Sequence, residues 1–237
     1  MRPVDKGVAP QAYTNYEDAK QDLTNRLGGY CSYCERRIAT GLAVEHILPK
    51  DPALGHSHLR NEWTNFLLSC VNCNSAKKTT IINFATYLLP DRDNTFHYLI
   101  YKETGLVEVT LGLNATIEPM AQNICDLTAL NRVEHDDWDD AVVFSALERA
   151  GQRVQAWEKA KDARQDYNNG EVNVRRICSE ASATGFFSIW MAAFTGVKEV
   201  RLGLIQEFAH TAKDCFDADG NSISPRPANG LLNAGKA

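Results

Sequence analysis

Two pairs of cysteines, each with two residues between its members, constrain this chain more than any other feature. The first pair is Cys31 and Cys34, and the second is Cys70 and Cys73. The C-x-x-C spacing lets both thiolates of a pair reach one ion, and four thiolates complete the tetrahedral shell of a structural zinc ion. Buried free thiols or redox pairs are the alternatives, but two such pairs in one chain favour zinc. The sequence therefore predicts one Zn²⁺ bound by these four cysteines.

Composition supports a globular chain whose thiols stay reduced. Of its 237 residues, 44% are hydrophobic and 23% are charged, which excludes disordered, collagen-like and coiled-coil proteins. A chain of this length buries a core without disulfides. Residues 1–20 contain no apolar run typical of a signal peptide, and the longest uncharged stretch, residues 181–197, is too short and too polar for a membrane span. We expect a soluble cytoplasmic protein with no membrane partner.

Charge is distributed unevenly along the chain. The net charge is −5, which excludes attraction of the whole surface to nucleic acid. Residues 28–80 hold six Lys or Arg against four Asp or Glu, whereas residues 81–140 hold three against eleven. Any site for nucleic acid is therefore a local patch, and the cysteine-containing segment is the most positively charged place for it.

The local patterns predict short elements around the cysteines and a mainly helical C-terminal region. A capping box of Thr14 and Glu17 predicts a helix that ends at Gly28. Alternating apolar residues predict a hairpin within 96–111. Other helices are predicted over 120–130, from about 136 to 168, and over 171–183, 185–195 and 198–209. The stripe expected to be buried on the long helix is Val143, Leu147, Ala150, Val154 and Trp157.

The 35 residues between the cysteine pairs carry polar groups suited to phosphodiester chemistry. A strand end, VEHILPK at 44–50, presents the adjacent Glu45 and His46, and residues 61–78 contain Asn65, Asn74 and Lys77. Each residue alone has an ordinary interpretation as a surface pair or a cap. Together they suggest a site, because a neutral imidazole accepts a proton from water at pH 7, and carboxylate and amide oxygens suit a hard divalent cation.

This arrangement resembles the HNH endonuclease family. The matching residues are Cys31, Cys34, Glu45, His46, Asn65, Cys70, Cys73, Asn74 and Lys77. The resemblance implies an α+β chain with a ββα-metal core, in which His46 is the general base. It also implies that Glu45 and Asn74 hold a catalytic Mg²⁺ or another divalent ion, and that Asn65 fixes the loop carrying His46. Many members of the family have Asp where this chain has Glu45.

Nearby cations are candidates for contacts with the phosphates of the substrate. They are Lys50, Lys77, Lys78, Arg36 and Arg37. For each of them, a solvated surface position is the alternative.

A wider resemblance covers most of the chain. Residues 121–132, 185–194 and 211–227 are similar to segments of the nuclease subunits of Septu-type antiphage systems, whose partner is an ABC-like ATPase. The pattern of elements places a domain boundary near residue 135. We therefore expect an HNH nuclease domain with an N-terminal helix and an accessory hairpin over 1–134, and a helical region over 135–237 for which the similarity implies a partner-docking role. The expected activity is metal-dependent hydrolysis of nucleic acid, with DNA as the substrate. A non-catalytic zinc module and a stand-alone restriction nuclease remain alternatives.

Overall fold

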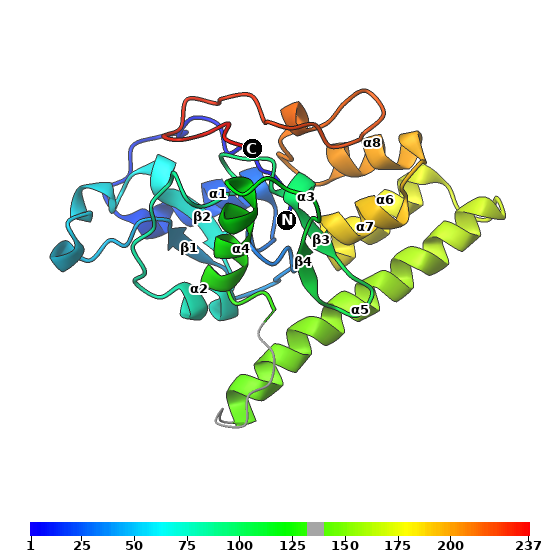
Figure 1. The fold of residues 1–237 in the computed structure, drawn as a ribbon, viewed down its shortest axis with the longest axis horizontal. Helices are drawn as coiled ribbons and strands as arrows, with labels where there is room; N and C mark the ends of the chain where they lie inside the picture. The colour runs from blue at the N-terminus through cyan, green and yellow to red at the C-terminus, as the bar shows by residue number, and fades with distance from the viewer. Residues whose placement is uncertain (132–139) are drawn as a thin grey trace.

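The computed structural model describes the backbone of residues 1–131 and 140–237, and the side chains of all of these except 140–146. Two small sheets and several helices form one body (Figure 1). The α-helices are α1 (Ala19–Leu27), α2 (Val71–Lys77), α3 (Thr95–Tyr98), α4 (Ile117–Leu127), α5 (Asp140–Asn168), α6 (Val174–Thr184), α7 (Phe187–Ala193) and α8 (Lys198–Glu207). The strands are β1 (Ala43–His46), β2 (Phe66–Ser69), β3 (Leu99–Tyr101) and β4 (Val107–Val109). Short 3₁₀ turns are η1 (Tyr16–Asp18), η2 (Pro52–Leu54), η3 (Ser57–Leu59), η4 (Trp63–Asn65) and η5 (Lys213–Cys215).

Strand β1 pairs with β2 in an antiparallel hairpin, and α2 follows β2 after the single residue Cys70. In the register of this pair, Glu45 lies opposite Leu67 and His46 opposite Phe66. The four residues of β2 are buried, as their unbroken apolar run FLL predicts. The order strand, loop, strand, helix gives a ββα unit, and the 3₁₀ turns η2, η3 and η4 occupy its long loop.

Three of the elements expected from the sequence are shorter than expected or displaced. The first helix begins in the 3₁₀ turn η1, where Asn15, not Thr14, accepts a hydrogen bond from the Glu17 amide. The hairpin β3–β4 covers only the middle of 96–111, because residues 95–98 form the one-turn helix α3. The helix expected over 120–130 is α4, which starts at Ile117 with Pro119 in its first turn.

The long helix α5 packs with a different face from the one that the apolar stripe predicted. Of the predicted stripe, Leu147 is 59% exposed and Val143 lies outside the described side chains, whereas Ala150, Val154 and Trp157 are half-buried at the edge of the packed face and Trp157 packs against the core. The side chains that α5 buries are Arg149, Arg153, Ala156, Ala160 and Ala163. Arg149 donates to the carbonyls of Thr128 and Ala129, and Arg153 to that of Leu130. These carbonyls belong to the turn that follows α4, and the buried guanidinium groups supply the donors that they need.

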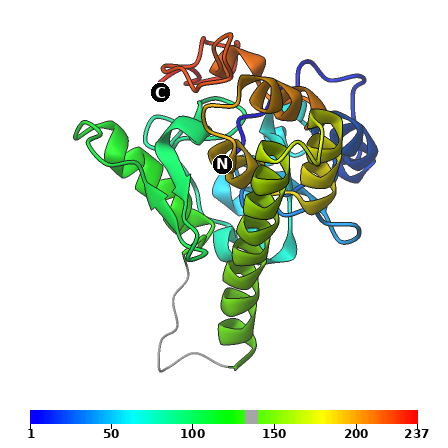
Figure 2. The same ribbon diagram turned by 90° about the vertical axis from the view of Figure 1, so that its right-hand side faces the viewer.

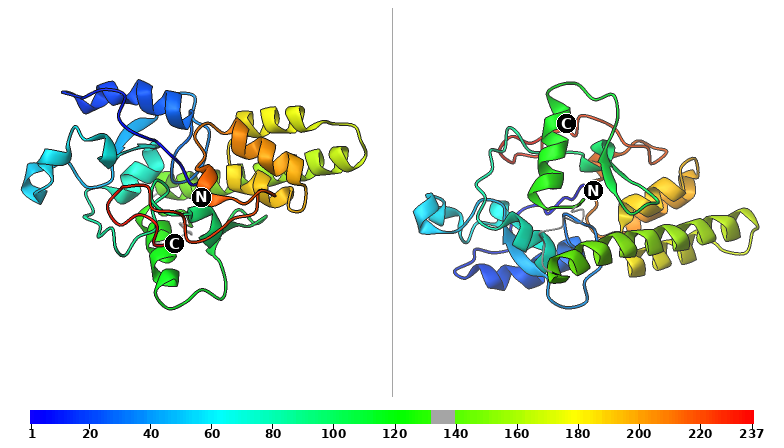
Figure 3. Two further views of the ribbon diagram at one scale, coloured as in Figure 1. Left: turned by 90° about the horizontal axis from the view of Figure 1, so that it is seen from above. Right: turned by 60° about the horizontal axis from the view of Figure 1, so that its bottom comes forward.

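Helices α6, α7 and α8 pack together beside α5, whose first turns extend beyond the body (Figures 2 and 3). The aromatic residues Phe186, Phe187, Trp190 and Phe194 are all buried, which confirms that they belong to the core. Cys125, Cys178 and Cys215 are also buried and free of disulfides. Within the described residues, no helix combines the length and the apolar character that crossing a membrane requires.

The helical region is joined to the turn that carries the first cysteine pair. The carboxylate of Glu35 accepts hydrogen bonds from the amide of Ser188 at 2.8 Å and from its hydroxyl at 2.6 Å, at the N-terminus of α7. The Phe186 amide donates to the Glu35 carbonyl. Gly185 has φ +82°, and a Cβ there would lie 2.6 Å from the Arg37 amide nitrogen, so only glycine fits. The predicted boundary at 134/135 lies outside the described residues, and one apolar core continues through both parts.

Candidate active site and zinc site

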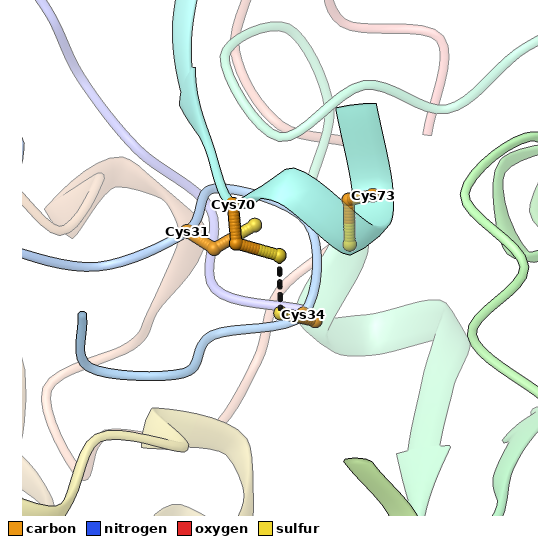
Figure 4. Close-up of side chains that lie close together, drawn as sticks. All are labelled: Cys31, Cys34, Cys70 and Cys73. Carbon is orange, nitrogen blue, oxygen red and sulfur yellow. Dashed lines mark hydrogen bonds between the residues drawn. The ribbon is translucent and has the colours of Figure 1, made fainter. Parts of the chain in front are cut away.

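The four cysteines of the two C-x-x-C pairs meet in one buried cluster. Cys31 and Cys34 come from the turn after Gly29, whereas Cys70 caps α2 and Cys73 lies in its first turn (Figure 4). Their sulfur atoms all lie within 4.8 Å of one another, and the Cys34 and Cys70 sulfurs are 3.7 Å apart. Tetrahedral zinc with Zn–S bonds of about 2.3 Å separates its sulfurs by about 3.8 Å. The cluster therefore fits the zinc ion that the spacing predicts.

Arg36 lies beside this cluster and is buried, in contrast to the surface position that phosphate contact requires. Its guanidinium donates to Asn72 at 2.5 Å and to Gln152 at 3.4 Å. Burial lowers the pKa of Arg36, but the thiolates of Cys34 and Cys70 raise it more. Four thiolates around a divalent ion leave a net charge of about −2, which this cation partly offsets. Arg37 is exposed, donates to the Ser182 carbonyl and lines a different cavity from His46.

A second site lies at the end of β1. Here a cavity of about 420 Å³ brings together several of the residues singled out in the sequence. Its lining includes Glu45, His46, Lys50, Asp51, Arg60, Asn74 and Lys78. We refer to it as the His46 cavity. Glu45 and His46 are the last two residues of β1, and Asn74 lies on α2, so the ββα unit itself builds the site.

His46 is held in one tautomer by its surroundings. Its Nε2 lies 2.8 Å from the carbonyl oxygen of Arg60, which can only accept, so Nε2 carries the proton and Nδ1 the lone pair. The rings of Tyr16 and Phe66 pack against the imidazole edge to face. Burial lowers the pKa of His46; the hydrogen bond to the Arg60 carbonyl opposes this shift, and the charges of Lys50 and the neighbouring cations add to it, so the pKa stays below its ordinary value. The imidazole is therefore neutral at pH 7.

Asn65 fixes the segment that follows His46. Its Oδ1 accepts from the Leu48 amide at 2.8 Å, and its Nδ2 donates to the Leu48 carbonyl at 2.9 Å. The Asn65 carbonyl accepts from Ile47 at 2.9 Å. The buried Asn65 side chain thus makes the hydrogen bonds to the Leu48 backbone that a further residue pair of the β1–β2 sheet would make, at the point where the chain leaves the sheet.

Lys77 is buried, so it does not occupy the surface position that phosphate contact requires. Its Nζ lies 2.9 Å from Glu45 Oε1, although not at a hydrogen-bonding angle, and donates to the His46 carbonyl at 2.8 Å. Burial raises the pKa of Glu45, and the charge of Lys77 opposes this shift. Lys77 is four residues after the buried Cys73, on the same face of α2, and this spacing is the signal in the sequence that it faces the interior.

The donor set of the His46 cavity fits a hard divalent cation. Glu45 offers a carboxylate and Asn74 an amide oxygen, which are ligands that Mg²⁺ and Ca²⁺ prefer. With Glu45 and Asn74 as its protein ligands, the ion would take its remaining ligands from water and phosphate oxygens, as is usual for Mg²⁺. The four-cysteine cluster differs from this arrangement, since a Zn²⁺ with four thiolates has no open position.

Tyr16 and Arg60 are site residues that the sequence did not reveal. Both contact His46, Tyr16 through its ring and Arg60 through its backbone carbonyl. Neither has a motif around it, because Tyr16 lies before the first cysteine and Arg60 within the irregular loop between β1 and β2.

Asn65→Ala is expected to lower the rate at which the chain cleaves nucleic acid by about 10²-fold. The loss of the Leu48 contacts would let His46 move, and a displacement of about 1 Å at a catalytic group lowers the rate by about this factor. The variant should keep its zinc. Cleavage rate and zinc content measure the two effects, and Asn25→Ala, which changes an exposed asparagine of α1, is the control. Unchanged turnover in Asn65→Ala would show that the Leu48 contacts do not position His46.

Comparison with known proteins agrees with this geometry. No curated protein matches the chain. Residues 31–80, which run from the first cysteine past the end of α2, match the family model described as HNH endonuclease. This match supports a nuclease, a hydrolase that acts on nucleic acid, and residues 31–80 are similar to an HNH endonuclease domain.

Proposed function

We propose that this chain is a divalent-metal-dependent endonuclease that hydrolyses phosphodiester bonds of DNA, with His46 as its general base. The observation that carries the proposal is the state of His46. Its Nε2 is held by the Arg60 carbonyl, which leaves the lone pair on Nδ1, and it lines one cavity with three carboxylate or amide side chains and three cations. A base in this state can take a proton from water at pH 7.

In the proposed reaction, each residue of the His46 cavity has a different role. His46 Nδ1 accepts the proton of the attacking water, while the Arg60 carbonyl keeps the ring in place. Lys50 and Lys78 attract the phosphate backbone. Glu45 and Asn74 would hold the divalent ion, which when bound neutralises charge on the phosphate oxygens. The zinc of the cysteine cluster has a structural role in this scheme.

The substrate is tested by measuring cleavage of three labelled nucleic acids of the same sequence: a DNA duplex, a DNA single strand and an RNA strand. We expect cleavage of DNA in the presence of Mg²⁺, and little cleavage of RNA. Binding of these strands without cleavage under any metal condition would instead favour the non-catalytic zinc module.

We further propose that the nuclease acts as one subunit of an ATPase-coupled antiphage complex, as the similarity to Septu-type subunits implies. Because the aromatic residues of 186–194 are buried, they are not available to a partner. The free surface of α5 around the exposed Leu147 is the better candidate for docking.

Co-expression with an ABC-like ATPase encoded in the same locus should give a complex that stays together in gel filtration, and Leu147→Glu should weaken it. Truncation after residue 134 is a poor test, since it removes Ser188 from the buried Glu35 carboxylate. Separate elution of the two wild-type proteins would contradict the partner assignment and favour a stand-alone nuclease.

A further inference from the structure

An aromatic ring from outside the matched residues 31–80 contacts three residues that line the His46 cavity, namely His46, Lys50 and Arg60. Tyr16 belongs to η1, which packs against β1 although it precedes the matched residues 31–80. The centroids of the Tyr16 and His46 rings are 4.7 Å apart, with their planes at 70°. The Tyr16 hydroxyl donates to Glu17 at 3.2 Å. The N-terminal segment therefore supplies a fixed ring directly beside the proposed base.

Two cations lie near the same ring. The Nζ of Lys50 is 3.6 Å from the centroid of Tyr16, and the guanidinium carbon of Arg60 is 5.8 Å from it. Both distances fall within the limit of about 6 Å for a cation–π interaction. A lysine or arginine on the surface normally samples many rotamers, so the ring restricts where these two charges lie. We name Tyr16, Lys50 and Arg60 the Tyr16 clamp.

The charges around the His46 cavity leave the clamp without an acidic partner. Lys50, Arg60 and Lys78 line the cavity, and among the described residues none of the three forms an ion pair. Of the two acids in the lining, Glu45 pairs with the buried Lys77, and Asp51 accepts from the Ala53 amide at the start of η2. The excess of positive charge at the cavity mouth therefore favours an anion.

We propose that the Tyr16 clamp binds the phosphate backbone of the nucleic acid beside the bond that His46 attacks, with Tyr16 as the positioning residue. The inference rests on the proposed nuclease function and adds to it the residues that hold the substrate strand. Arg60 contributes both to the orientation of His46 and to the binding of phosphate, because its carbonyl contacts His46 while the residue lines the cavity. In this arrangement Arg60, and not Arg36, joins Lys50 and Lys78 as a phosphate contact.

Binding of a short fluorescein-labelled DNA duplex in magnesium-free buffer tests the clamp separately from cleavage. Lys50→Ala and Arg60→Ala should each weaken affinity by roughly tenfold, the value of one hydrogen-bonded charge contact. Each should also lower the slope of log K against log salt by about 0.9, one phosphate contact. Arg60→Ala keeps the carbonyl that holds His46, so its loss of cleavage should appear mainly in KM.

Two further variants separate positioning from charge. Tyr16→Leu should weaken affinity by roughly 3- to 10-fold through the lost cation–π contacts, and Tyr16→Phe, which keeps the ring, should restore it. Lys198→Ala on α8 removes the same charge from a surface ion pair with Asp219 and should change neither affinity nor slope. Zinc content shows whether each variant is folded.

The clamp is overturned if Lys50→Ala and Arg60→Ala match Lys198→Ala in affinity and salt slope while the wild type still cleaves DNA. That result would leave the nuclease function standing. A wild type that neither binds nor cleaves would overturn both. Equal affinity of Tyr16→Leu and Tyr16→Phe for the duplex would show that the Tyr16 ring does not position the cations. In that case the affinities of the folded Lys50→Ala and Arg60→Ala variants would decide whether the two cations contact phosphate.

Discussion

Replacing His46 with alanine is expected to reduce phosphodiester cleavage by roughly 10²–10⁴-fold, the usual effect of losing a general base. The imidazole lies outside the cysteine cluster, so the variant should retain its zinc and its fold. The rate of plasmid nicking, measured beside zinc content and the circular dichroism spectrum, separates loss of chemistry from loss of structure.

Asn74→Ala is the matched comparison for His46→Ala, because it removes an oxygen donor from the same cavity and leaves the base intact. Raising the Mg²⁺ concentration should restore part of its activity by mass action. The same increase should not rescue His46→Ala. Equal cleavage by His46→Ala and the wild type would show that another group activates water and that the nuclease assignment of this cavity is wrong.

Cys70→Ser is expected to release the zinc and unfold the region around the cluster. Metal binding at such a site is coupled to folding, with apparent binding free energies of about 10–16 kcal/mol for structural zinc. Cys70 also caps α2, which carries Asn74 and Lys77, so the change should abolish activity as well. Elemental analysis and thermal melting measure the effect.

Cys215→Ser is the control for this substitution, because Cys215 is buried far along the chain and has no ligand-spaced cysteine. It should keep the zinc. Full zinc occupancy in Cys70→Ser, or no zinc in wild type purified without chelator, would contradict the four-cysteine site.

The sequence predicted the parts of this molecule that depend on local spacing. The C-x-x-C pairs lie in one cluster, and α6, α7 and α8 fall within a few residues of their predicted ranges. Spacing was sufficient there because the apolar period of a helix and the reach of a cysteine turn are local properties.

The ion pairs and burial of the charged residues at the site could not be predicted from local spacing. Lys77 looks like a surface cation at the end of a helix, yet it is 1% exposed and lies against Glu45, 32 positions earlier in the chain. Such a pairing depends on how α2 packs on β1. The sequence shows only that Lys77 lies on the same face of α2 as Cys73.

The prediction of the buried face of α5 was displaced for a related reason. Hydrophobic periodicity treats arginine as a surface residue, so it selected the stripe through Leu147. The structure buries Arg149 and Arg153, because the carbonyls after α4 need donors that only a tertiary neighbour can supply. The Glu35 carboxylate at the start of α7 is a second case of the same kind.

We propose that the His46 cavity is a nuclease site that depends on a divalent ion distinct from the zinc expected at the cysteine cluster. The most direct measurement is conversion of supercoiled plasmid by one zinc-containing preparation of the wild type, dialysed free of loosely bound metal, with and without added Mg²⁺ and with and without the ATPase. We predict nicked and linear products only when Mg²⁺ is added, at constant zinc content. Intact plasmid under all four conditions, or cleavage that follows zinc and ignores Mg²⁺, would contradict the claim.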